Sequence, residues 1–355
     1  MKPIDERTSV TRQTWVAAVA ALIFLACVAI ISFAPVPYVA WTPGSTYNLL
    51  SATDGKPLVE VTGVESHPTT GELQLTTVGV TPVASRLNLL EALVAYWRPS
   101  SDALPRDAVY PPQLDPQTVT SQEAAQMGVA QSTAAVAAVR EAGLEVRELP
   151  QVVAVTPSGP AVGHLEVGDL IAKIGDTAVS SADGIEQAMA QYHVGDQIPV
   201  TYLRDDAENQ VKITAEASAT LGGVPDIGVT FAPGYTFAPR VHFNVDPAIG
   251  GPSGGLMFSL AIYDKLSGDD VAGGRIVAGS GTIDAQGRVG TIGGIKEKIA
   301  GAMNSGATIF LLPAGNCADV ARTAGIQLVP VGTLRDAVRA LQATKSGAGS
   351  VDACP

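Results

Sequence analysis

The sequence predicts an α+β protein in which one apolar helix precedes a folded region of roughly two domains. The first observation is size: the chain has 355 residues and a hydrophobic content of 46%, which is enough to bury a sizeable core. The second is an uncharged stretch, residues 13–53, which is almost wholly apolar from Trp15 to Ala34. The third is the remainder of the chain, where short strand-like runs alternate with turns and helical stretches.

The uncharged stretch predicts a membrane-spanning helix over residues 13–34. About twenty apolar residues match the thickness of a bilayer core. Lys2, Arg7 and Arg12 come before the stretch, and no Lys or Arg follows it until Lys56. By the positive-inside rule, residues 1–12 are expected in the cytoplasm and the rest of the chain outside the cell membrane, with the helix crossing once.

A cleaved signal peptide is the competing interpretation of this stretch. Ser32-Phe33-Ala34 has the small-x-small pattern of a cleavage site. Pro35 directly after it disfavours cleavage, however, and the apolar run is longer than a typical signal-peptide core. Tyr38 and Trp41 then suit a membrane–water interface. We therefore expect an uncleaved anchor.

Charge and cysteine usage limit the possible partners. The net charge is −12 and Lys and Arg form no cluster, so nucleic acid is not an expected partner. The four His residues are scattered and no His/Cys spacing suits zinc, so no metal or cofactor is expected. Cys27 lies inside the apolar stretch. Cys317 and Cys354 would lie outside the cell, where a disulfide and two free thiols fit the sequence equally well.

The segment 35–142 reads as short strands followed by helices. Thr120 and Glu123 have the spacing of a capping box, so a long Ala-rich helix is expected to begin there. Gly128 is a candidate interruption of that helix and Gly143 its stop. The other expected elements are strands at Leu58–Val61 and Glu72–Val78, a helix at Leu87–Trp97, and a polar loop from there to Pro116.

Residues 143–218 differ in residue pattern from the segments around them and resemble a bacterial PDZ domain. The matching pieces are "SGPA" at 158–161, "LEVGDLIAKIGD" at 165–176, the Ser181-Ala182-Asp183 helix entry, and "VGDQIPVTYLRD" at 194–205. PDZ domains bind extended peptides, often C-termini, by adding a strand to a sheet edge. The resemblance places the peptide-binding loop and edge strand at Gly143, Leu144, Glu145 and Val146. A plain helix stop is the alternative for Gly143.

A glycine-rich turn, Ile249–Gly255, presents Ser253 and leads into an apolar helix that ends at Gly268. Pro252 suits the first turn of that helix. Backbone N–H groups around Gly251 and Ser253 would lie at the positive end of the helix dipole, where they could hold an oxyanion. Taken alone, the same string also fits a helix cap without chemistry.

A nucleophilic serine needs a base, and a partly buried lysine can act as one because burial lowers its pKa. The expected helix from Ile295 to Asn304 offers Lys296 and Lys298. At about 100° per residue they fall on opposite flanks of its apolar face, so helical geometry does not choose between them. Two solvated surface lysines are the alternative.

Two segments resemble the proteolytic domain of Lon proteases: "VHFNVDPAIGGPSGG" at 241–255 and "GRVGTIGGIKEK" at 287–298. The resemblance implies a Ser–Lys dyad of Ser253 and Lys298, because the family's lysine ends a Gly-Gly-aliphatic-x-x-Lys pattern. It also implies a supporting hydroxyl at Ser280 in "AGSGTI".

The chain departs from the Lon pattern at three points. Gly254 replaces the family's alanine after the serine, and Gly250 stands where an acidic residue is usual, which puts carboxylate-gated regulation in doubt. The sequence also contains no Gly-x4-Gly-Lys-Ser/Thr phosphate loop, so no ATP-binding module is expected.

The layout resembles the membrane-anchored, PDZ-containing Lon-like proteases of bacteria. "GELQLTTVGV" and "TSQEAAQMG" resemble that family's N-terminal part, so we expect the PDZ domain to be inserted between two halves of the protease fold. Lon-type domains commonly form rings, which implies a homo-oligomer, a hexamer by resemblance. The expected segments are 1–12 cytoplasmic, 13–34 transmembrane, 35–142 first part of the protease, 143–218 PDZ, 219–344 proteolytic domain and 345–355 flexible tail.

The resemblance therefore predicts an ATP-independent serine endopeptidase that cleaves extended or unfolded segments outside the membrane, with peptides captured by the PDZ domain. A non-catalytic, membrane-anchored PDZ scaffold with a degenerate protease domain is the main alternative. An enzyme of different chemistry is a third, because Ser–Lys dyads also serve signal peptidases and amidases. The Gly-Gly-aliphatic-x-x-Lys context disfavours it.

Overall fold

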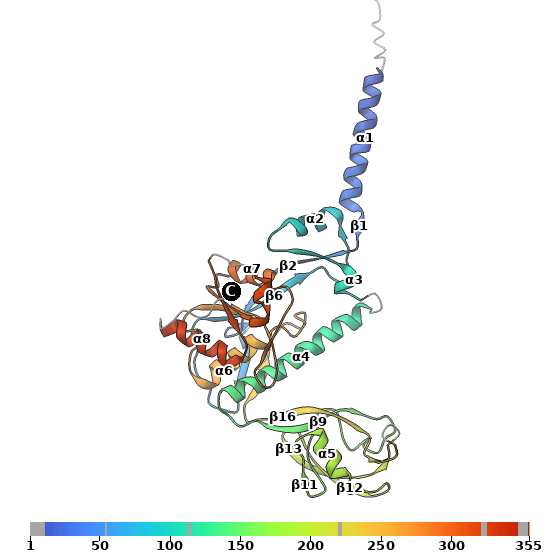
Figure 1. The fold of residues 1–355 in the computed structure, drawn as a ribbon, viewed down its shortest axis with the longest axis vertical. Helices are drawn as coiled ribbons and strands as arrows, with labels where there is room; N and C mark the ends of the chain where they lie inside the picture. Colours follow the sequence, from blue (N-terminus) through green and yellow to red (C-terminus); the bar gives the residue numbers. More distant parts are fainter. Residues whose placement is uncertain are drawn as a thin grey trace, which may run out of the picture.

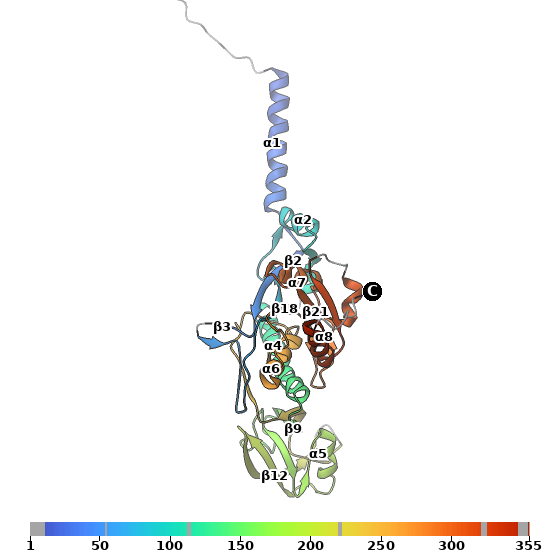
Figure 2. The same cartoon turned by 90° about the vertical axis from the view of Figure 1, so that its left-hand side faces the viewer.

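The computed structural model describes residues 11–53, 55–111, 115–218, 222–320, 325–346 and 354. A long helix, a central α+β domain and a smaller β-rich domain follow one another along the long axis of the molecule (Figure 1). The view turned by 90° shows the same order (Figure 2). Residues 1–10, most of the expected cytoplasmic segment, lie outside the described residues.

Helix α1 (Arg12–Phe33) coincides with the expected spanning segment to within one residue at each end. Thr11 caps it by accepting a hydrogen bond from the Thr14 N–H, as N-cap threonines do. No residue of the helix is buried against the protein. By length and composition it is able to cross a membrane.

The central domain is built on one six-stranded sheet whose strands come from both sides of the PDZ segment. Its order is β22-β21-β18-β6-β2-β8. Strand β18 pairs in parallel with β6, with Ile276 opposite Glu72. The early strands are β2 (Tyr38–Asn48), β6 (Glu72–Val80) and β8 (Asp102–Pro105); the late ones are β18 (Ile276–Gly279), β21 (Ile309–Pro313) and β22 (Gln327–Val331).

Alternate residues of these strands supply two hydrophobic layers, as the period of two along a strand requires. Ile309 and Leu311 face a layer shared with α4 (Pro116–Glu141), α6 (Gly255–Ser267) and α8 (Leu334–Ser346). Phe310 and Leu312 face the other layer, which includes α7 (Ile295–Asn304). The first layer contains Leu73, Leu75 and Met127 beside residues of α6, so the segment before the PDZ domain and the segment after it share one core.

Shorter elements complete the central domain. Strand β17 pairs with β5 antiparallel, and β1 pairs with β7. These elements are β1 (Pro35–Val36), β3 (Ala52–Thr53), β4 (Lys56–Pro57), β5 (Val59–Thr62), β7 (Leu87–Asn88), α2 (Leu89–Trp97), α3 (Arg106–Val109), β17 (Arg240–Phe243), β19 (Thr282–Ile283), β20 (Val289–Gly290) and the 3₁₀ helix η1 (Ala314–Asp319).

The PDZ domain has its own sheet, of order β13-β12-β10-β9-β16, and its own core. Helix α5 (Ala182–Met189) contributes Ile185 to that core. The strands are β9 (Arg147–Val155), β10 (Leu170–Ile174), β11 (Thr177–Ala178), β12 (Gln197–Arg204), β13 (Ala207–Thr214) and β16 (Val229–Thr236), with a small β14 (Glu216–Ala217) and β15 (Pro225–Asp226) pair beside them.

Strand β16 lies beyond residue 218, where the sequence placed the end of the PDZ domain. It pairs with β9 over its whole length, and Val229 and Phe231 pack against the PDZ core. An isolated run of β-formers does not show which sheet it will join, so the sequence alone assigned this strand to the protease domain. Because Arg147 is paired with Thr236, the chain enters and leaves this sheet at neighbouring positions.

Helix α4 begins earlier than the capping-box spacing suggested. Asp115 is its N-cap and accepts hydrogen bonds from the Gln117 and Thr118 N–H groups, with Pro116 at the first helical position. The helix runs through Gly128 without interruption. It ends before Gly143, whose φ of 75° is the left-handed conformation that suits a glycine after a helix.

Cys317 and Cys354 form a disulfide across a sequence separation of 37 residues. Of the expected tail, Lys345 and Ser346 form the end of α8 and Cys354 is buried. The other tail residues lie outside the described part of the chain.

Candidate active site

The glycine-rich turn holds Ser253 just before α6. The helix begins at Gly255 with Gly254 as its N-cap, so Pro252 precedes the helix instead of opening it. The Ser253 carbonyl accepts hydrogen bonds from the Gly281 N–H at 2.9 Å and from the Ser280 hydroxyl at 2.8 Å. A side chain at position 255 would approach the backbone nitrogen of Ile283 to 3.0 Å. The close contact between this turn and the 280–283 segment therefore depends on glycine.

Lys298 reaches this turn from α7. Its Nζ lies 2.8 Å from the Ser253 Oγ and 2.9 Å from the Ser280 Oγ. The residue is only 3% exposed. Gly294, at the N-terminus of α7, has a φ of 68°, a conformation that glycine adopts without strain.

Lys296, the other candidate, points elsewhere. Its Nζ forms a salt bridge with Asp102 and donates to the Ser101 carbonyl at 3.1 Å. Tertiary packing thus separates two lysines that helical periodicity left equivalent.

Burial lowers the pKa of the Lys298 ammonium to about 8, and the nearby Glu297 opposes that shift. A donor and an acceptor can be assigned to each hydrogen bond around the Lys298 amine. The Ser280 hydroxyl donates to the Ser253 carbonyl, so its oxygen is left to accept from Lys298. In the neutral amine, this leaves a lone pair available for the Ser253 hydroxyl. The arrangement fits a base that takes a proton from Ser253.

Glu297 is an unusual neighbour for this lysine. It is 1% exposed, and neither carboxylate oxygen has a hydrogen-bond partner among the described residues. Burial raises its pKa, and Asp102 adds to the shift. A carboxyl group that is more easily protonated opposes loss of the Lys298 proton less strongly.

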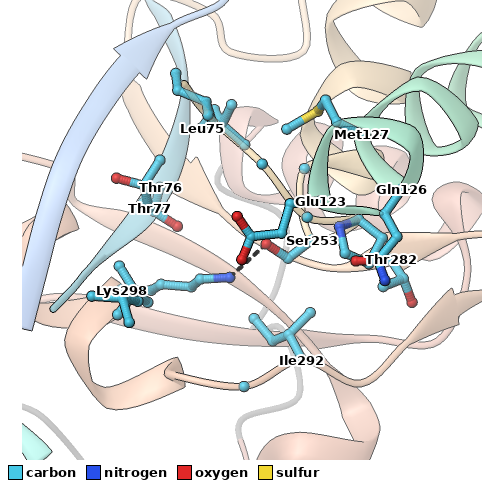
Figure 3. Close-up of a pocket in the computed structure, with 18 of the residues that line it drawn as sticks. Leu75, Thr76, Thr77, Glu123, Gln126, Met127, Ser253, Thr282, Ile292 and Lys298 are labelled. Carbon is cyan, nitrogen blue, oxygen red and sulfur yellow. Dashed lines mark hydrogen bonds between the residues drawn. The ribbon is translucent and has the colours of Figure 1, made fainter. Parts of the chain in front are cut away.

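A cavity of about 640 Å³ opens over Ser253 and Lys298. Its lining mixes apolar and polar side chains, among them Leu75, Met127 and Ile292 beside Thr76, Thr77 and Gln126 (Figure 3). Trp41 also lines it. The charged side chains that line it are Glu123, Asp246 and Lys298. Within the described ranges, no group of three or more His, Cys, Asp or Glu side chains could hold a metal ion.

Glu123 is a cavity residue that the sequence reading assigned only to a helix cap. Its side chain enters the cavity from α4, on the side of Ser253 and Lys298 (Figure 3). A Cβ at Gly250 would lie 2.7 Å from the Glu123 Cβ. Glu123 therefore fills the space that a side chain at position 250 would need. Position 250 is the one where Lon sequences usually carry an acidic residue. Nothing local in the sequence signals this, because the two residues meet only through packing of α4 on the serine turn.

The N–H groups of the turn are not equivalent. The Gly251 N–H donates to the Glu123 carbonyl at 3.1 Å, so it is already engaged and is not free to hold an oxyanion in this conformation. The N–H groups of Ser253 and Gly254 have no hydrogen-bond partner within the described chain. Free N–H groups next to Ser253 suit an oxyanion better than an engaged one.

The expected PDZ residues Gly143, Leu144, Glu145 and Val146 lie between α4 and β9 and belong to no strand. Strand β9 is flanked by β10 and β16, so the segment does not lead into an edge strand. The edge strand beside α5 is β16. It follows the turn Ile227-Gly228, and it contains Pro233, which is tolerated in an edge strand because it lacks an N–H.

Two family models match the chain. The model of the PDZ domain matches residues 127–215, and that of the Lon protease (S16) C-terminal proteolytic domain matches residues 240–341. Together they place a PDZ domain before a Lon-type proteolytic domain in one chain, in the order expected from the sequence.

Individual relatives include Lon proteases and Do-like serine proteases. Lon protease 4 of Sorangium cellulosum is 26% identical over 270 residues, covering 67% of this chain and 33% of the relative. The serine protease Do-like HtrA of Lactococcus lactis subsp. cremoris is 38% identical over 60 residues, covering 16% of this chain and 15% of the relative. The chain spans between 20% and 33% of the length of three Lon relatives that it matches.

Among solved structures, the PDZ domain of the SdrC-like protein of Listeria monocytogenes is 28% identical, with a TM-score of 0.22. The match covers 23% of this chain and 86% of the chain in that structure.

Proposed function

The chain carries a PDZ domain and a proteolytic domain of the Lon type, and from this we propose that it is an ATP-independent serine endopeptidase with a Ser253–Lys298 dyad. The observation that carries the proposal is the 2.8 Å contact between the Lys298 Nζ and the Ser253 Oγ, made by a lysine that is almost fully buried. The main alternative, a non-catalytic scaffold, would not need a desolvated lysine against a serine.

In the proposed reaction, neutral Lys298 accepts the Ser253 proton while the Ser253 Oγ attacks the scissile carbonyl carbon. Lys298 then gives the proton to the leaving amine, and the acyl-enzyme forms. Water, deprotonated by the same lysine, attacks the ester carbonyl; the lysine then returns the proton to the departing Ser253 Oγ, which releases the acid product and frees Ser253. General acid–base assistance of this kind contributes about 10²- to 10⁴-fold in rate. Ser280 is a positioning residue, because its hydroxyl fixes the Lys298 amine and the Ser253 carbonyl together.

The N–H groups of Ser253 and Gly254 are the proposed oxyanion donors. They lie at the start of α6, where the helix dipole favours negative charge. The Gly251 N–H would join them only if it left the Glu123 carbonyl, which requires a shift of α4 relative to the turn.

Substrates are proposed to be extended or unfolded segments. The sequence carries no phosphate loop of the kind that powers unfolding. Peptide capture is proposed at the outer edge of β16, beside α5, because the strand has no further partner in the described sheet. This edge replaces the segment Gly143–Val146, which lies outside the sheet.

The proteolytic domain is proposed to lie outside the cell membrane, anchored by α1. The Lys and Arg distribution around α1 supports this orientation. The Cys317–Cys354 disulfide supports it independently, because disulfides persist in oxidising compartments. The homo-oligomeric ring implied by the resemblance to Lon stays a prediction.

The dyad is tested with the full-length protein in detergent, using casein and a short fluorogenic peptide. Ser253→Ala and Lys298→Met are expected to abolish hydrolysis. Lys296→Met is the matched control: it alters the same helix, two residues away, and is expected to retain activity because Lys296 faces Asp102. Activity that survives both dyad substitutions would sink the proposal. An inactive but folded and peptide-binding wild type would favour the scaffold.

A further inference from the structure

Helix α2 presents several of its large apolar side chains to solvent and its small ones to the protein, while Leu89 and Leu93 are half-buried. Leu90, Val94 and Trp97 are 50%, 38% and 70% exposed, whereas the buried positions are Ala92 and Ala95. With Leu93, the three exposed residues have the spacing i, i+3, i+4 and i+7, which makes one continuous stripe along the helix. A surface helix of a soluble domain normally turns such a stripe inward.

The position of α2 identifies what covers this stripe. Strand β7, directly before α2, pairs with β1, directly after α1, with Asn88 opposite Pro35. Paired residues in adjacent strands lie about 5 Å apart. The start of α2 is thereby fixed next to the end of α1, and α1 also contacts α2. Figures 1 and 2 show α2 at the base of α1, lying across its direction.

The chemistry around α2 fits the boundary between lipid headgroups and acyl chains. Tyr96 and Trp97 are both about 70% exposed, at 71% and 70%, and aromatic residues of these types favour that boundary. Exposed Arg86 and Arg98 flank the helix, where they would meet lipid phosphates. The one charged residue within the helix, Glu91, is used as a cap, since its carboxylate accepts from the Asn88 N–H at 2.9 Å.

We propose that α2 is an interfacial helix whose Leu90/Leu93/Val94/Trp97 stripe inserts into the lipid surface from which α1 emerges. The inference rests on the proposed membrane anchoring by α1 and is independent of the dyad. Two contacts with the membrane, one spanning and one lying flat, fix the orientation of the central domain, whereas a single helix leaves it free to swivel. The central domain, which carries the cavity over Ser253, lies between α1 and the PDZ domain (Figure 1), so it is then held nearer the membrane than the PDZ domain.

The test reconstitutes the full chain in vesicles of phosphatidylcholine and phosphatidylglycerol, with and without bromine on the acyl chains. Trp15→Phe removes the indole of α1, and the difference between this variant and Trp15→Phe/Trp97→Phe isolates the emission of Trp97. That emission is expected to be blue-shifted and to lose most of its intensity in brominated vesicles. Trp41 remains in the double variant. It lines the cavity over Ser253 instead of the membrane–water interface that the sequence suggested, so it is the internal control and is expected to keep its intensity.

The outcomes separate this inference from the proposals it builds on. If the protein floats with the vesicles but Trp97 emits as a water-exposed indole and is not quenched, the anchor stands and the interfacial helix is overturned. If Trp97 is shielded only at high protein density, and without quenching by bromolipid, a second copy covers the stripe and the inference is also wrong. Failure to float overturns both the anchor and the interfacial helix, and leaves the dyad unaffected.

A functional arm uses Leu90→Gln/Val94→Gln/Trp97→Gln, three exposed positions outside the catalytic machinery. Flotation and hydrolysis of a soluble peptide are expected to persist, while cleavage of a membrane-tethered substrate falls relative to that peptide. Val167→Gln/Val194→Gln, at exposed positions of the PDZ domain, is the matched control and is expected to leave the ratio unchanged. An unchanged ratio in the triple variant would show that the stripe does not orient the enzyme.

Discussion

At the scale of single residues, the proposed reaction depends on Lys298, a lysine whose pKa burial lowers to about 8. Only the neutral amine can accept the Ser253 proton, so the active fraction grows as pH rises through that value. We predict that kcat/KM for a soluble peptide increases with pH with an apparent pKa of about 8 and then levels off. A rate that stays flat, or falls, across this range would argue against Lys298 as the base.

Glu297 provides a second test at the residue scale, because its charge raises the pKa of Lys298. Removing the charge with Glu297→Gln is expected to move the apparent pKa of kcat/KM downward, so that relatively more activity remains at neutral pH. The measurement is the pH–rate profile of the variant. Glu186→Gln, on the exposed side of α5 in the PDZ domain, should reproduce the wild-type profile. An upward move would contradict the assigned electrostatics.

At the scale of elements, two glycines in helices play opposite roles. A Cβ at Gly255 would meet the Ile283 backbone at 3.0 Å, whereas one at Gly128 meets nothing within 4 Å. Gly255→Ala is predicted to displace the serine turn, lowering activity and costing about 1–3 kcal/mol of stability. Gly128→Ala is predicted to stabilise α4 by up to about 1 kcal/mol, because alanine is the better helix former. The stability of both variants is measured by denaturant unfolding and their activity by peptide hydrolysis. If the two substitutions change stability and activity equally, the predicted contrast is wrong.

Element types were largely predictable, but their ends were not. The helix of residues 295–304 and the glycine stop of α6 at Gly268 coincide with the expectation because local signals set them. The predicted start of α4 was wrong. Asp115 caps the helix and Pro116 opens it, while Thr120 and Glu123 only resembled a cap. The capping-box pattern was satisfied in sequence, yet Glu123 is used in the cavity, and only packing reveals that.

At the scale of the whole molecule, the chain enters and leaves the PDZ sheet at residues that lie side by side, since Arg147 pairs with Thr236. Replacing residues 147–236 by a short Gly/Ser linker is predicted to leave a folded proteolytic domain that still hydrolyses a short peptide. Circular dichroism melting and peptide hydrolysis are the measurements. Excising only residues 143–217 removes β9 and leaves β16 without its partner, so the resulting protein is expected to aggregate. If the longer excision cannot fold, the insertion arrangement is wrong.

The disulfide also acts on the whole molecule, because it closes the C-terminal region onto η1. For a separation of 37 residues, cross-linking the unfolded chain is worth up to about 4 kcal/mol. We predict that Cys317→Ser/Cys354→Ser, or a reductant, lowers the melting temperature. Cys27→Ser is the control, since Cys27 is unpaired in α1. A reductant that leaves the melting temperature unchanged would show that the bond does not contribute.

The sequence by itself determined the apolar helix, the order of the PDZ and proteolytic segments, and the identity of the Ser253 and Lys298 motifs. These rest on local composition and on contiguous patterns of residues. Only the tertiary structure decided that β16 completes the PDZ sheet, that Glu123 occupies the space above Gly250, and that the stripe of α2 faces outward beside α1. Each of these depends on which surfaces meet across long separations in the chain, and a short pattern carries no information about its distant partner.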